Sequence, residues 1–369
     1  MSLLLNNKKI TMLVFTFLLS TNLFSLQLGN GNKENQFIPI KVMDNVNQIS
    51  ASDGYTMIIK NDNELWATGE NLYGRFGTDN YKETDSFVFI KDDVKYVETT
   101  VDFSLIICND NTLWISGRYP SKLSSKNELI WEKTSNYKKI DDDVIKVSAG
   151  SRFFIYLKSD GSLWGIGNNS FGELGLENMR GVVKPQLLAT NVINLFSGLH
   201  CTYYVDIKND LYLSGSKTYF LDNKNNEIVS NRFVKVYTDI ECVSTGLLLK
   251  TNGDLYSFGY GRYGALGIGK EGSTMEPITF VMHNVKKISS SQEHSLIVLQ
   301  NGNLLSSGGG SHCNFGTIGD GTTNPSYSFV LIMENVKDVS VGYYFSMVLK
   351  EDGTLWAFGV NNNESALSL

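Results

Sequence analysis

Residues 153–175 read FFIYLKSDGSLWGIGNNSFGELG, and this stretch decides the fold. Its first six residues are rich in aromatic and β-branched side chains, which favours a strand. An Asp-Gly pair follows at Asp160, and such a pair between apolar runs signals a β-hairpin because both residues tolerate a positive φ. Leu163 and Trp164 then begin a second apolar segment. The stretch therefore predicts two antiparallel strands joined by a tight turn.

The hydrophobic pair of this hairpin recurs along the whole chain. Successive pairs are separated by 48, 50, 48, 44, 49 and 51 residues, and a constant spacing of this size is typical of repeat architectures. Each pair follows a short polar turn, so each begins the second strand of a hairpin. The seven pairs are Leu65-Trp66, Leu113-Trp114, Leu163-Trp164, Leu211-Tyr212, Leu255-Tyr256, Leu304-Leu305 and Leu355-Trp356.

Two further strands complete each repeat. They are predicted at residues 144–148, 285–289 and 336–340 before the hairpin, and at 86–90, 232–236 and 328–332 after it. Four short strands per repeat are typical of a propeller blade, and seven repeats form a ring. The chain is therefore predicted to be all-β, a seven-bladed β-propeller of four-stranded blades.

The ends of the chain indicate how the ring closes. The last repeat stops before its fourth strand could form, while residues 36–42, QFIPIKV, resemble the fourth strands of other repeats. We expect this N-terminal strand to pair with the C-terminal blade, so that neither end leaves a long unpaired edge. Residues 36–369 would then form a single domain.

The amino terminus has the layout of a secretory signal peptide. Lys8 and Lys9 precede an apolar run from Ile10 to Phe24, which is short for a membrane span of roughly 20 apolar residues. We expect residues 1–25 to be a signal peptide and residues 26–35 a short linker. The mature chain would be secreted, periplasmic or on the cell surface, with no integral membrane span. An uncleaved N-terminal anchor is the alternative.

The charge of the chain argues against a nucleic-acid partner. It has 32 Lys and Arg against 38 Asp and Glu, a formal net charge of −6. Removing residues 1–25 takes away two lysines and no acid, which changes this to −8. An acidic surface without a basic run repels nucleic acid.

The segments after the hydrophobic pairs carry a family resemblance. Residues 69–77 read GENLYGRFG, residues 167–175 GNNSFGELG and residues 259–267 GYGRYGALG. With the preceding Asp-Gly-x-Leu-Trp pattern and an upstream Gly-x-x-His-Ser pattern, the chain resembles the regulator of chromosome condensation repeat family. The pattern is lost after Gly117 and Gly215, where we expect longer or irregular outer loops.

The resemblance implies a seven-bladed propeller but not one activity. The eukaryotic founder of the family is a nucleotide exchange factor for a nuclear GTPase, and exported bacterial members include a protein inhibitor of β-lactamases. A fold supports several functions, so this likeness indicates protein binding only by analogy. The predicted signal peptide favours an exported, bacterial-type member.

No motif predicts a cofactor. Gly259, Gly261 and Gly264 match the dinucleotide fingerprint, but that motif needs a helix after it, and Ala265-Leu266-Gly267 continues the repeat instead. These glycines are expected to serve turns.

The cysteines and histidines predict neither a metal site nor a catalytic group, because their spacing is irregular. Cys201 stands where other repeats have aromatic residues and is expected to be buried, with a disulfide to Cys242 as an alternative. His294 is expected to make a structural hydrogen bond. The residues are Cys108, Cys201, Cys242, Cys313, His200, His283, His294 and His312.

The candidate binding residues lie in two-residue loops that vary within the regular repeat. Equivalent loops of a ring emerge on one axial face, so they predict a composite patch. Arg and Tyr are favoured interface anchors, which puts Arg152, Tyr343 and Tyr344 first. The alternative is that these loops vary because nothing constrains them. The predicted partner-binding residues are Asp102, Arg152, His200, Glu293, Tyr343 and Tyr344.

Taken together, these patterns predict an exported propeller that binds a protein partner and is not an enzyme. The alternative is a carbohydrate-binding or hydrolytic propeller that uses its central depression. That reading requires several acidic side chains at the axis, and Asp102 and Glu293 are too few. Tyr73, Phe171 and Tyr263 are expected to pack between blades.

Overall fold

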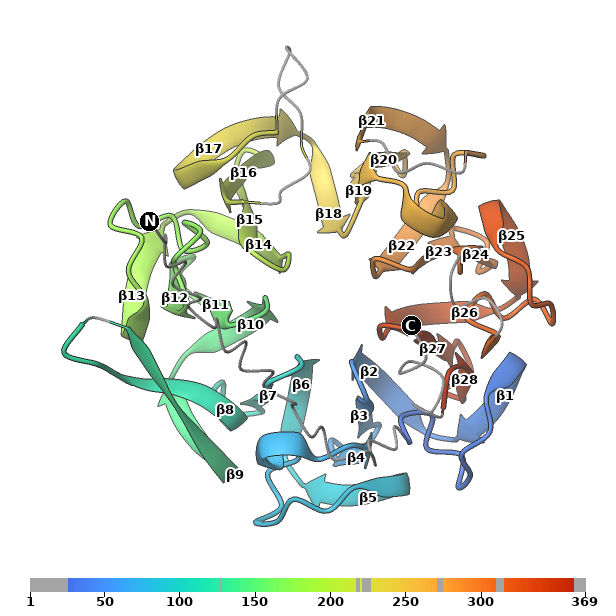
Figure 1. Cartoon of the computed structure of the whole chain (residues 1–369), viewed down its shortest axis with the longest axis horizontal. Coiled ribbons are helices and arrows are strands. Elements are labelled where there is room, and N and C mark those ends of the chain that lie inside the picture. Colours follow the sequence, from blue (N-terminus) through green and yellow to red (C-terminus); the bar gives the residue numbers. More distant parts are fainter. Residues whose placement is uncertain are drawn as a thin grey trace, which may run out of the picture.

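The computed structural model describes residues 26–126, 128–216, 220, 227–270, 275–309 and 315–361. Its strands form seven four-stranded antiparallel sheets arranged around a central axis (Figure 1). The first strand of each sheet lies nearest the axis and the fourth lies at the rim. The predicted all-β, seven-bladed propeller is confirmed.

The blades are numbered in chain order. Blade 1 contains β2 (Val46–Ser52), β3 (Tyr55–Lys60), β4 (Leu65–Gly69) and β5 (Thr84–Lys91). Blade 2 contains β6 (Val94–Thr99), β7 (Phe103–Cys108), β8 (Leu113–Leu123) and β9 (Leu129–Asp141). Blade 3 contains β10 (Val144–Ala149), β11 (Phe153–Lys158), β12 (Leu163–Gly167) and β13 (Val182–Ala189). Blade 4 contains β14 (Val192–Ser197), β15 (Cys201–Asp206), β16 (Asp210–Gly215) and β17 (Ser230–Thr238).

The remaining blades complete the ring. Blade 5 contains β18 (Ile240–Ser244), β19 (Leu247–Lys250), β20 (Leu255–Tyr260) and β21 (Met275–Met282). Blade 6 contains β22 (Val285–Ser290), β23 (His294–Leu299), β24 (Leu304–Gly308) and β25 (Ser326–Met333). Blade 7 contains β26 (Val336–Val341), β27 (Phe345–Lys350), β28 (Leu355–Gly359) and β1 (Gln36–Met43). Two short 3₁₀ turns, η1 (Leu72–Gly74) and η2 (Arg262–Gly264), follow β4 and β20.

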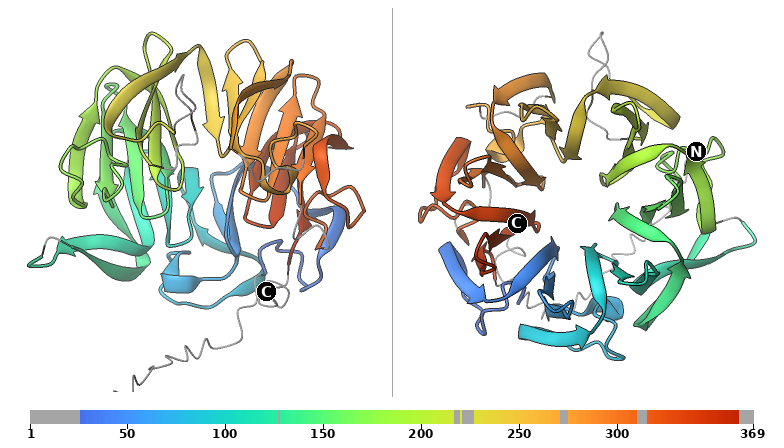
Figure 2. Two further views of the ribbon diagram at one scale, coloured as in Figure 1. Left: turned by 45° about the horizontal axis from the view of Figure 1, so that its top comes forward. Right: turned by 180° about the vertical axis from the view of Figure 1, so that it is seen from behind.

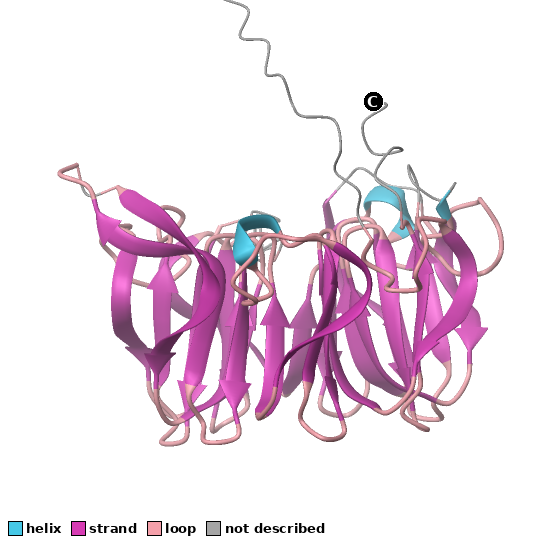
Figure 3. Ribbon diagram, turned by 90° about the horizontal axis from the view of Figure 1, so that it is seen from below, coloured by secondary structure: helices cyan, strands magenta, loops and turns pink. Residues whose placement is uncertain are grey.

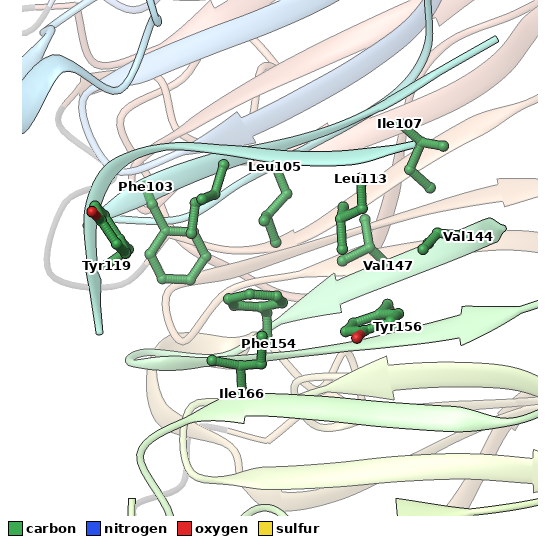
Figure 4. Close-up of a cluster of buried hydrophobic side chains, with 11 residues drawn as sticks. Phe103, Leu105, Ile107, Leu113, Tyr119, Val144, Val147, Phe154, Tyr156 and Ile166 are labelled. Atoms are coloured by element: carbon green, nitrogen blue, oxygen red, sulfur yellow. The ribbon is translucent and has the colours of Figure 1, made fainter. Parts of the chain in front are cut away.

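The core lies between neighbouring blades. Figure 4 shows the layer between blades 2 and 3, where Leu105 and Leu113 face Val147 and Phe154. All six residues of β7, FSLIIC, are buried. A strand buried on both faces reads as a continuous apolar run, without alternation. The second strand of each blade is therefore recognisable in the sequence as a mainly apolar run.

Ring closure occurs as expected, by pairing of β1 with β28 in antiparallel register. The segment before β1 differs from the expected linker, because its first residues are packed into the ring. Leu26, Gln27 and Leu28 are buried, and the Gln27 side-chain amide donates a hydrogen bond to the Val360 carbonyl at 2.5 Å. The folded domain therefore begins upstream of β1.

The packed segment, residues 26–29, completes a repeat motif that starts at the other end of the domain. In blade 1 the Asn71 Oδ1 accepts a hydrogen bond from the Phe76 N–H at 2.9 Å. In blade 7 the Asn361 Oδ1 accepts the corresponding bond from the Leu28 N–H at 3.2 Å. Leu28 thus takes the place that Phe76 holds in blade 1. We call residues 26–29 the closing segment.

The closing segment also contacts the next blade as an ordinary repeat loop does. The Thr68 hydroxyl donates to the Leu26 carbonyl at 3.1 Å. One blade further on, the Ser116 hydroxyl donates to the Gly74 carbonyl at 2.8 Å. Leu28 is completely buried. The ring is therefore closed twice, by the β1–β28 ladder and by a loop motif shared between the two ends.

One end of the ring carries the candidate site. Because the strands are antiparallel, the first-to-second and third-to-fourth connections of every blade lie at the same end, which we call the loop face. The 3₁₀ turns lie at this end (Figure 3). The guanidinium of Arg75, after η1, donates to the Val101 carbonyl in the first loop of blade 2 at 2.7 Å.

Blade 2 departs most from the repeat. β8 spans 11 residues and β9 spans 13, against five for β4 and β12. The two strands continue past the rim as a hairpin, the arm (residues 118–126 and 128–134), which Figures 1 and 2 show projecting from the ring. The longer outer loop expected after Gly117 is therefore a paired β-ribbon.

Candidate functional site

The six predicted binding residues lie at the loop face in two groups of three. Asp102, Arg152 and His200 come from blades 2, 3 and 4, and we call this region the groove arc. The second group comes from blades 6 and 7, beside the closing segment, and we call it the closure arc. Its members are Glu293, Tyr343 and Tyr344.

Asp102 positions two arginines in the groove arc. The residue is 8% exposed, and its carboxylate lies 3.8 Å from the Arg118 Nη1 and 3.9 Å from the Arg152 Nε. Burial raises the pKa of Asp102, while the nearby guanidinium groups oppose that rise. Arg152 remains 56% exposed, so its side chain is oriented by Asp102 and still available to a partner.

A groove with a volume of about 760 Å³ runs beside these residues. One wall is the arm, with Leu129 and Trp131, and the other is the third-to-fourth loop of blade 3, with Phe171 and Met179. Arg152 and His200 line the groove between them. Its size falls within the roughly 300–1,000 Å³ of typical ligand sites.

The exposed charge in the groove is mainly positive. Lys126, Arg152 and Arg180 are exposed lining residues, and Glu128 is the exposed acid among them. The other lining acid, Glu173, is completely buried. Its carboxylate accepts hydrogen bonds from the Asn168 side chain and the Phe171 N–H at 2.8 and 2.9 Å, and burial raises its pKa.

The aromatic residue before the repeat glycine has two different roles. Tyr73 packs between blades as expected, with the Lys133 ammonium of blade 2 at 5.0 Å from its ring centroid. Phe171 was expected to do the same, and that prediction is wrong. Its side chain is 42% exposed, and its ring lies 4.6 Å from the His200 ring in the groove wall.

The closure arc is tightly bonded within the ring. The Tyr343 and Tyr344 rings meet edge to face at 4.5 Å, and the Ser291 hydroxyl donates to the Tyr343 carbonyl at 3.4 Å. Glu293 is buried. Nearby His294 is also buried, with its Nε2 at 2.7 Å from the Ser346 hydroxyl, and burial lowers its pKa to about 3. The expected structural hydrogen bond of His294 is confirmed.

The axis carries charged residues that the sequence analysis missed. Burial raises the pKa of Cys242 to about 11, with Lys146 and Lys287 opposing and Asp338 adding to the rise. These residues lie on the first strands of blades 5, 3, 6 and 7, which are the strands nearest the axis. Glu98 of blade 2 joins them, and burial raises its pKa to about 7.

The acids at the axis are therefore not the two expected from sequence. Asp102 and Glu293 belong to the loop face, whereas Glu98 and Asp338 belong to the first strands. Lys146, Cys242 and Asp338 each hold the third position of a first strand and are partly exposed there. Glu98 holds the fifth position of its first strand. These equivalent positions are the sequence signal that could have located the residues at the axis.

Other sequence candidates keep structural roles. Cys108, Cys201 and Cys242 are free thiols, so the alternative disulfide between Cys201 and Cys242 is not formed. Cys201 is buried as expected, while Cys313 and His312 lie outside the described residues. After Gly261 comes a single 3₁₀ turn, and Gly264 has φ +81°.

Within the described ranges, no three His, Cys, Asp or Glu side chains gather as a metal site would require. In the same part of the chain, no helix is long and apolar enough to cross a membrane.

The fold and the loop face define a seven-bladed propeller that presents loops from rigid blades. Two family models described as regulator of chromosome condensation (RCC1) repeat match the chain, one at residues 144–173 and 336–364 and the other at residues 252–298. These parts of the chain therefore carry RCC1 repeats, as the sequence pattern indicated.

Curated relatives match parts of this chain in sequence. Human E3 ubiquitin-protein ligase HERC2 is 31% identical over 134 residues, which cover 34% of this chain and 3% of HERC2. The Arabidopsis thaliana ultraviolet-B receptor UVR8 is 22% identical over 315 residues, covering 79% of this chain and 60% of the receptor. The chain thus matches less than two thirds of the length of these curated relatives.

Solved structures show the same fold at low sequence identity. Human WBSCR16 superimposes with a TM-score of 0.71 at 17% identity, covering 88% of this chain and 89% of that one. Saccharomyces cerevisiae Prp20p, described with its binding to Gsp1p and histones, gives 0.70 at 16% identity, covering 87% and 85%.

Proposed function

We propose that this chain is an exported protein that binds another protein through the groove arc of its loop face. The observation that carries the proposal is the groove itself, in which exposed Arg152 and Phe171 lie on a rigid ring beside a projecting arm. Arginine and aromatic side chains are favoured anchors of protein interfaces. Loops held by a rigid scaffold are the usual place for binding residues.

The relatives support protein binding as the general role. Prp20p is described with its binding to Gsp1p and histones, so a propeller of this shape serves protein binding there. Which protein this chain binds does not follow from that likeness, because one fold hosts many functions. The net charge of −6 favours a protein over a nucleic acid.

Export is the second part of the proposal. Lys8 and Lys9 followed by the apolar run from Ile10 to Phe24 support a signal peptide over residues 1–25. We place the protein outside the cytoplasm, secreted, periplasmic or at the cell surface. Release of a chain that starts near Leu26 into culture medium or envelope fractions, measured by N-terminal sequencing, tests this placement, and recovery of unprocessed chain in the cytoplasm contradicts it.

A carbohydrate-binding or hydrolytic role at the axis is less supported. Glu98 and Asp338 are two acids in the channel, but Lys146 and Lys287 lie among them. A glycosidase needs one carboxyl group to give a proton and a second to act as base or nucleophile. Hydrolysis of a glycan, lost in Glu98→Gln, would favour this role over the one proposed.

The test compares the two arcs in affinity capture. The parent chain, an Arg152→Ala/Phe171→Ala variant and a Tyr343→Ala/Tyr344→Ala variant are incubated with envelope and culture-medium proteins. We expect the parent and the tyrosine variant to recover the same partner and the groove variant to lose it. Equal recovery by the parent and both variants contradicts the groove arc, and recovery of no protein contradicts the proposed function.

A further inference from the structure

The groove has a charge opposite to that of the chain as a whole. Three exposed cations, Lys126, Arg152 and Arg180, line it, against one exposed acid, Glu128. The neighbouring acid Asp102 is already held between two guanidinium groups. A protein with a net charge of −6 therefore concentrates positive charge in one hollow. Such focusing attracts anionic groups to that hollow and repels them elsewhere.

The same groove exposes apolar surface. Phe171 and Met179 are 42% and 44% exposed, and they lie across the groove from Leu129 and Trp131 on the arm. Exposed apolar side chains opposite one another bind apolar groups, and Met and aromatic residues are enriched in protein interfaces. The occupant therefore needs both acidic and apolar groups.

We propose that the groove binds a segment of a partner protein in which acidic residues flank an aromatic or aliphatic side chain. This inference rests on the proposed function and names the partner's chemistry. The apolar side chain would lie between Phe171 and Trp131, and the carboxylates would pair with Arg152 and Arg180. Lys126 on the arm adds a third cation at the same groove.

A polypeptide fits these observations better than an extended polyanion. Nucleic acids and acidic glycans carry charge along their whole length, whereas the groove combines exposed cations with apolar side chains in its walls. Electrostatic interactions persist over a Debye length of about 8–10 Å at ordinary ionic strength. A protein segment can confine its acidic residues to the groove and present uncharged surface elsewhere.

Fluorescence anisotropy with labelled peptides tests the inference on protein purified from expression of the full chain. Three short peptides share the same Leu and Phe residues, and the intervening residues are Asp and Glu, Asn and Gln, or Lys. A fourth keeps the acids but replaces Leu and Phe by Ser. We expect the acidic apolar peptide to bind about tenfold tighter than each of the others, and the preference to weaken as salt rises from about 0.1 M to about 1 M.

Single substitutions then assign the effect to the groove. Arg152→Ala and Arg180→Ala should each weaken binding of the acidic apolar peptide about fivefold, the upper value for exposed charge pairs. Glu128→Gln should tighten it, because it removes the opposing charge. Lys41→Ala, which removes one cation at β1 beside Asp44, is the matched control and should change nothing.

Two results overturn the inference. Equal affinity for the acidic and neutral peptides removes the charge argument, and tighter binding of heparin or an oligonucleotide with the same response to Arg152→Ala identifies a polyanion site. Neither result alters protein capture by the parent chain. If Arg152→Ala and Phe171→Ala leave both peptide binding and protein capture unchanged, the proposed function fails as well.

Discussion

The groove arc and the closure arc use the same repeat loop for different purposes. In blade 3 the loop is continuous, and Asn169 holds it through a hydrogen bond from the Leu174 N–H at 2.8 Å. In blade 7 the corresponding bond joins Asn361 to Leu28, from opposite ends of the domain. Leu174 and Leu28 hold the same place in the two loops and both are completely buried, but the first loop also exposes Phe171 to the groove.

The difference shows where a closed repeat ring is free to vary. A loop that connects the two ends must hold them by packing and hydrogen bonds, because no peptide bond joins the ring at that point. A loop within the continuous part of the ring does not have to hold two chain ends together. Blades 2 and 3 accordingly carry the arm and the groove, whereas in blades 6 and 7 Glu293 is buried and the partly exposed Tyr343 packs against Tyr344.

The largest effect is expected from Leu28→Ala in the closing segment. Replacing a fully buried leucine by alanine removes packing and leaves a cavity, so the free energy of unfolding should fall by about 3 kcal/mol. Urea unfolding measures this loss. Leu72→Ala, which truncates a leucine that is 40% exposed, is the control and should change the free energy of unfolding by less than about 0.5 kcal/mol. A loss below about 0.5 kcal/mol for Leu28→Ala as well would show that the closing segment is dispensable.

The second prediction uses pH to distinguish buried His294, near the closure arc, from Glu98 at the axis. His294 has a folded-state pKa of about 3, below its unfolded value of about 6.5, so the unfolded state binds more protons between these values. Its contribution to stability is therefore present above about pH 6.5 and is lost as the pH falls toward 3. His294→Gln should lessen the loss of stability of the folded chain over that window.

Glu98, on the first strand of blade 2, should behave in the opposite way. Its folded-state pKa is about 7 against about 4.3 when unfolded, so the folded state binds more protons between these values. Stability is then lost as the pH rises from about 4.5 to 7. Glu98→Gln should be more stable than the parent above pH 7, by about 1 to 2 kcal/mol after allowance for partial exposure.

Thermal unfolding of the parent and both variants across pH 3 to 8 checks the direction of both pH dependences of stability. The Glu98→Gln variant and the parent should become equal below about pH 4.5, where Glu98 is protonated in both states. A stabilisation that is independent of pH would mean that Glu98 does not titrate within the channel as described.

The smallest effect is expected from the tyrosines of the closure arc. Tyr343 packs against Tyr344 edge to face, and both lie away from the groove lining. Tyr343→Ala should change affinity for the captured partner by less than about twofold, because residues outside the central contact of an interface contribute little. A titration by surface plasmon resonance measures this. A loss as large as that of Arg152→Ala would extend the interface across the loop face.

Most of the fold could be predicted because the repeat signals are local. The hydrophobic pairs and Asp-Gly turns predicted the hairpins, and residues 36–42 resembled a fourth strand strongly enough to predict β1. The closing segment was missed because LQLG at residues 26–29 is only half of a loop motif. Its other half, at Asn361, lies 333 residues away, and neither half is recognisable alone.

The site could be predicted only where it follows the repeat. Arg152 and His200 were found because they occupy the two-residue loop of their blades. Leu129 and Trp131 were not found, because the arm replaces the repeat motif and its residues have no equivalents in the other repeats. Phe171 was assigned to packing because it has the same motif position as Tyr73. The Tyr73 ring is covered by the arm residues Arg118 and Lys133, whereas Phe171 is exposed in the groove wall.

Site-specific photocrosslinking tests the central claim most directly. A photoreactive phenylalanine analogue replaces either Phe171 in the groove arc or Tyr343 in the closure arc, two aromatic residues of similar exposure at 42% and 37%. The chain carrying the analogue at position 171 should form a covalent adduct with the captured partner, and the chain carrying it at position 343 should not. An adduct from position 343 alone would place the interface on the closure arc and contradict the assignment of the groove.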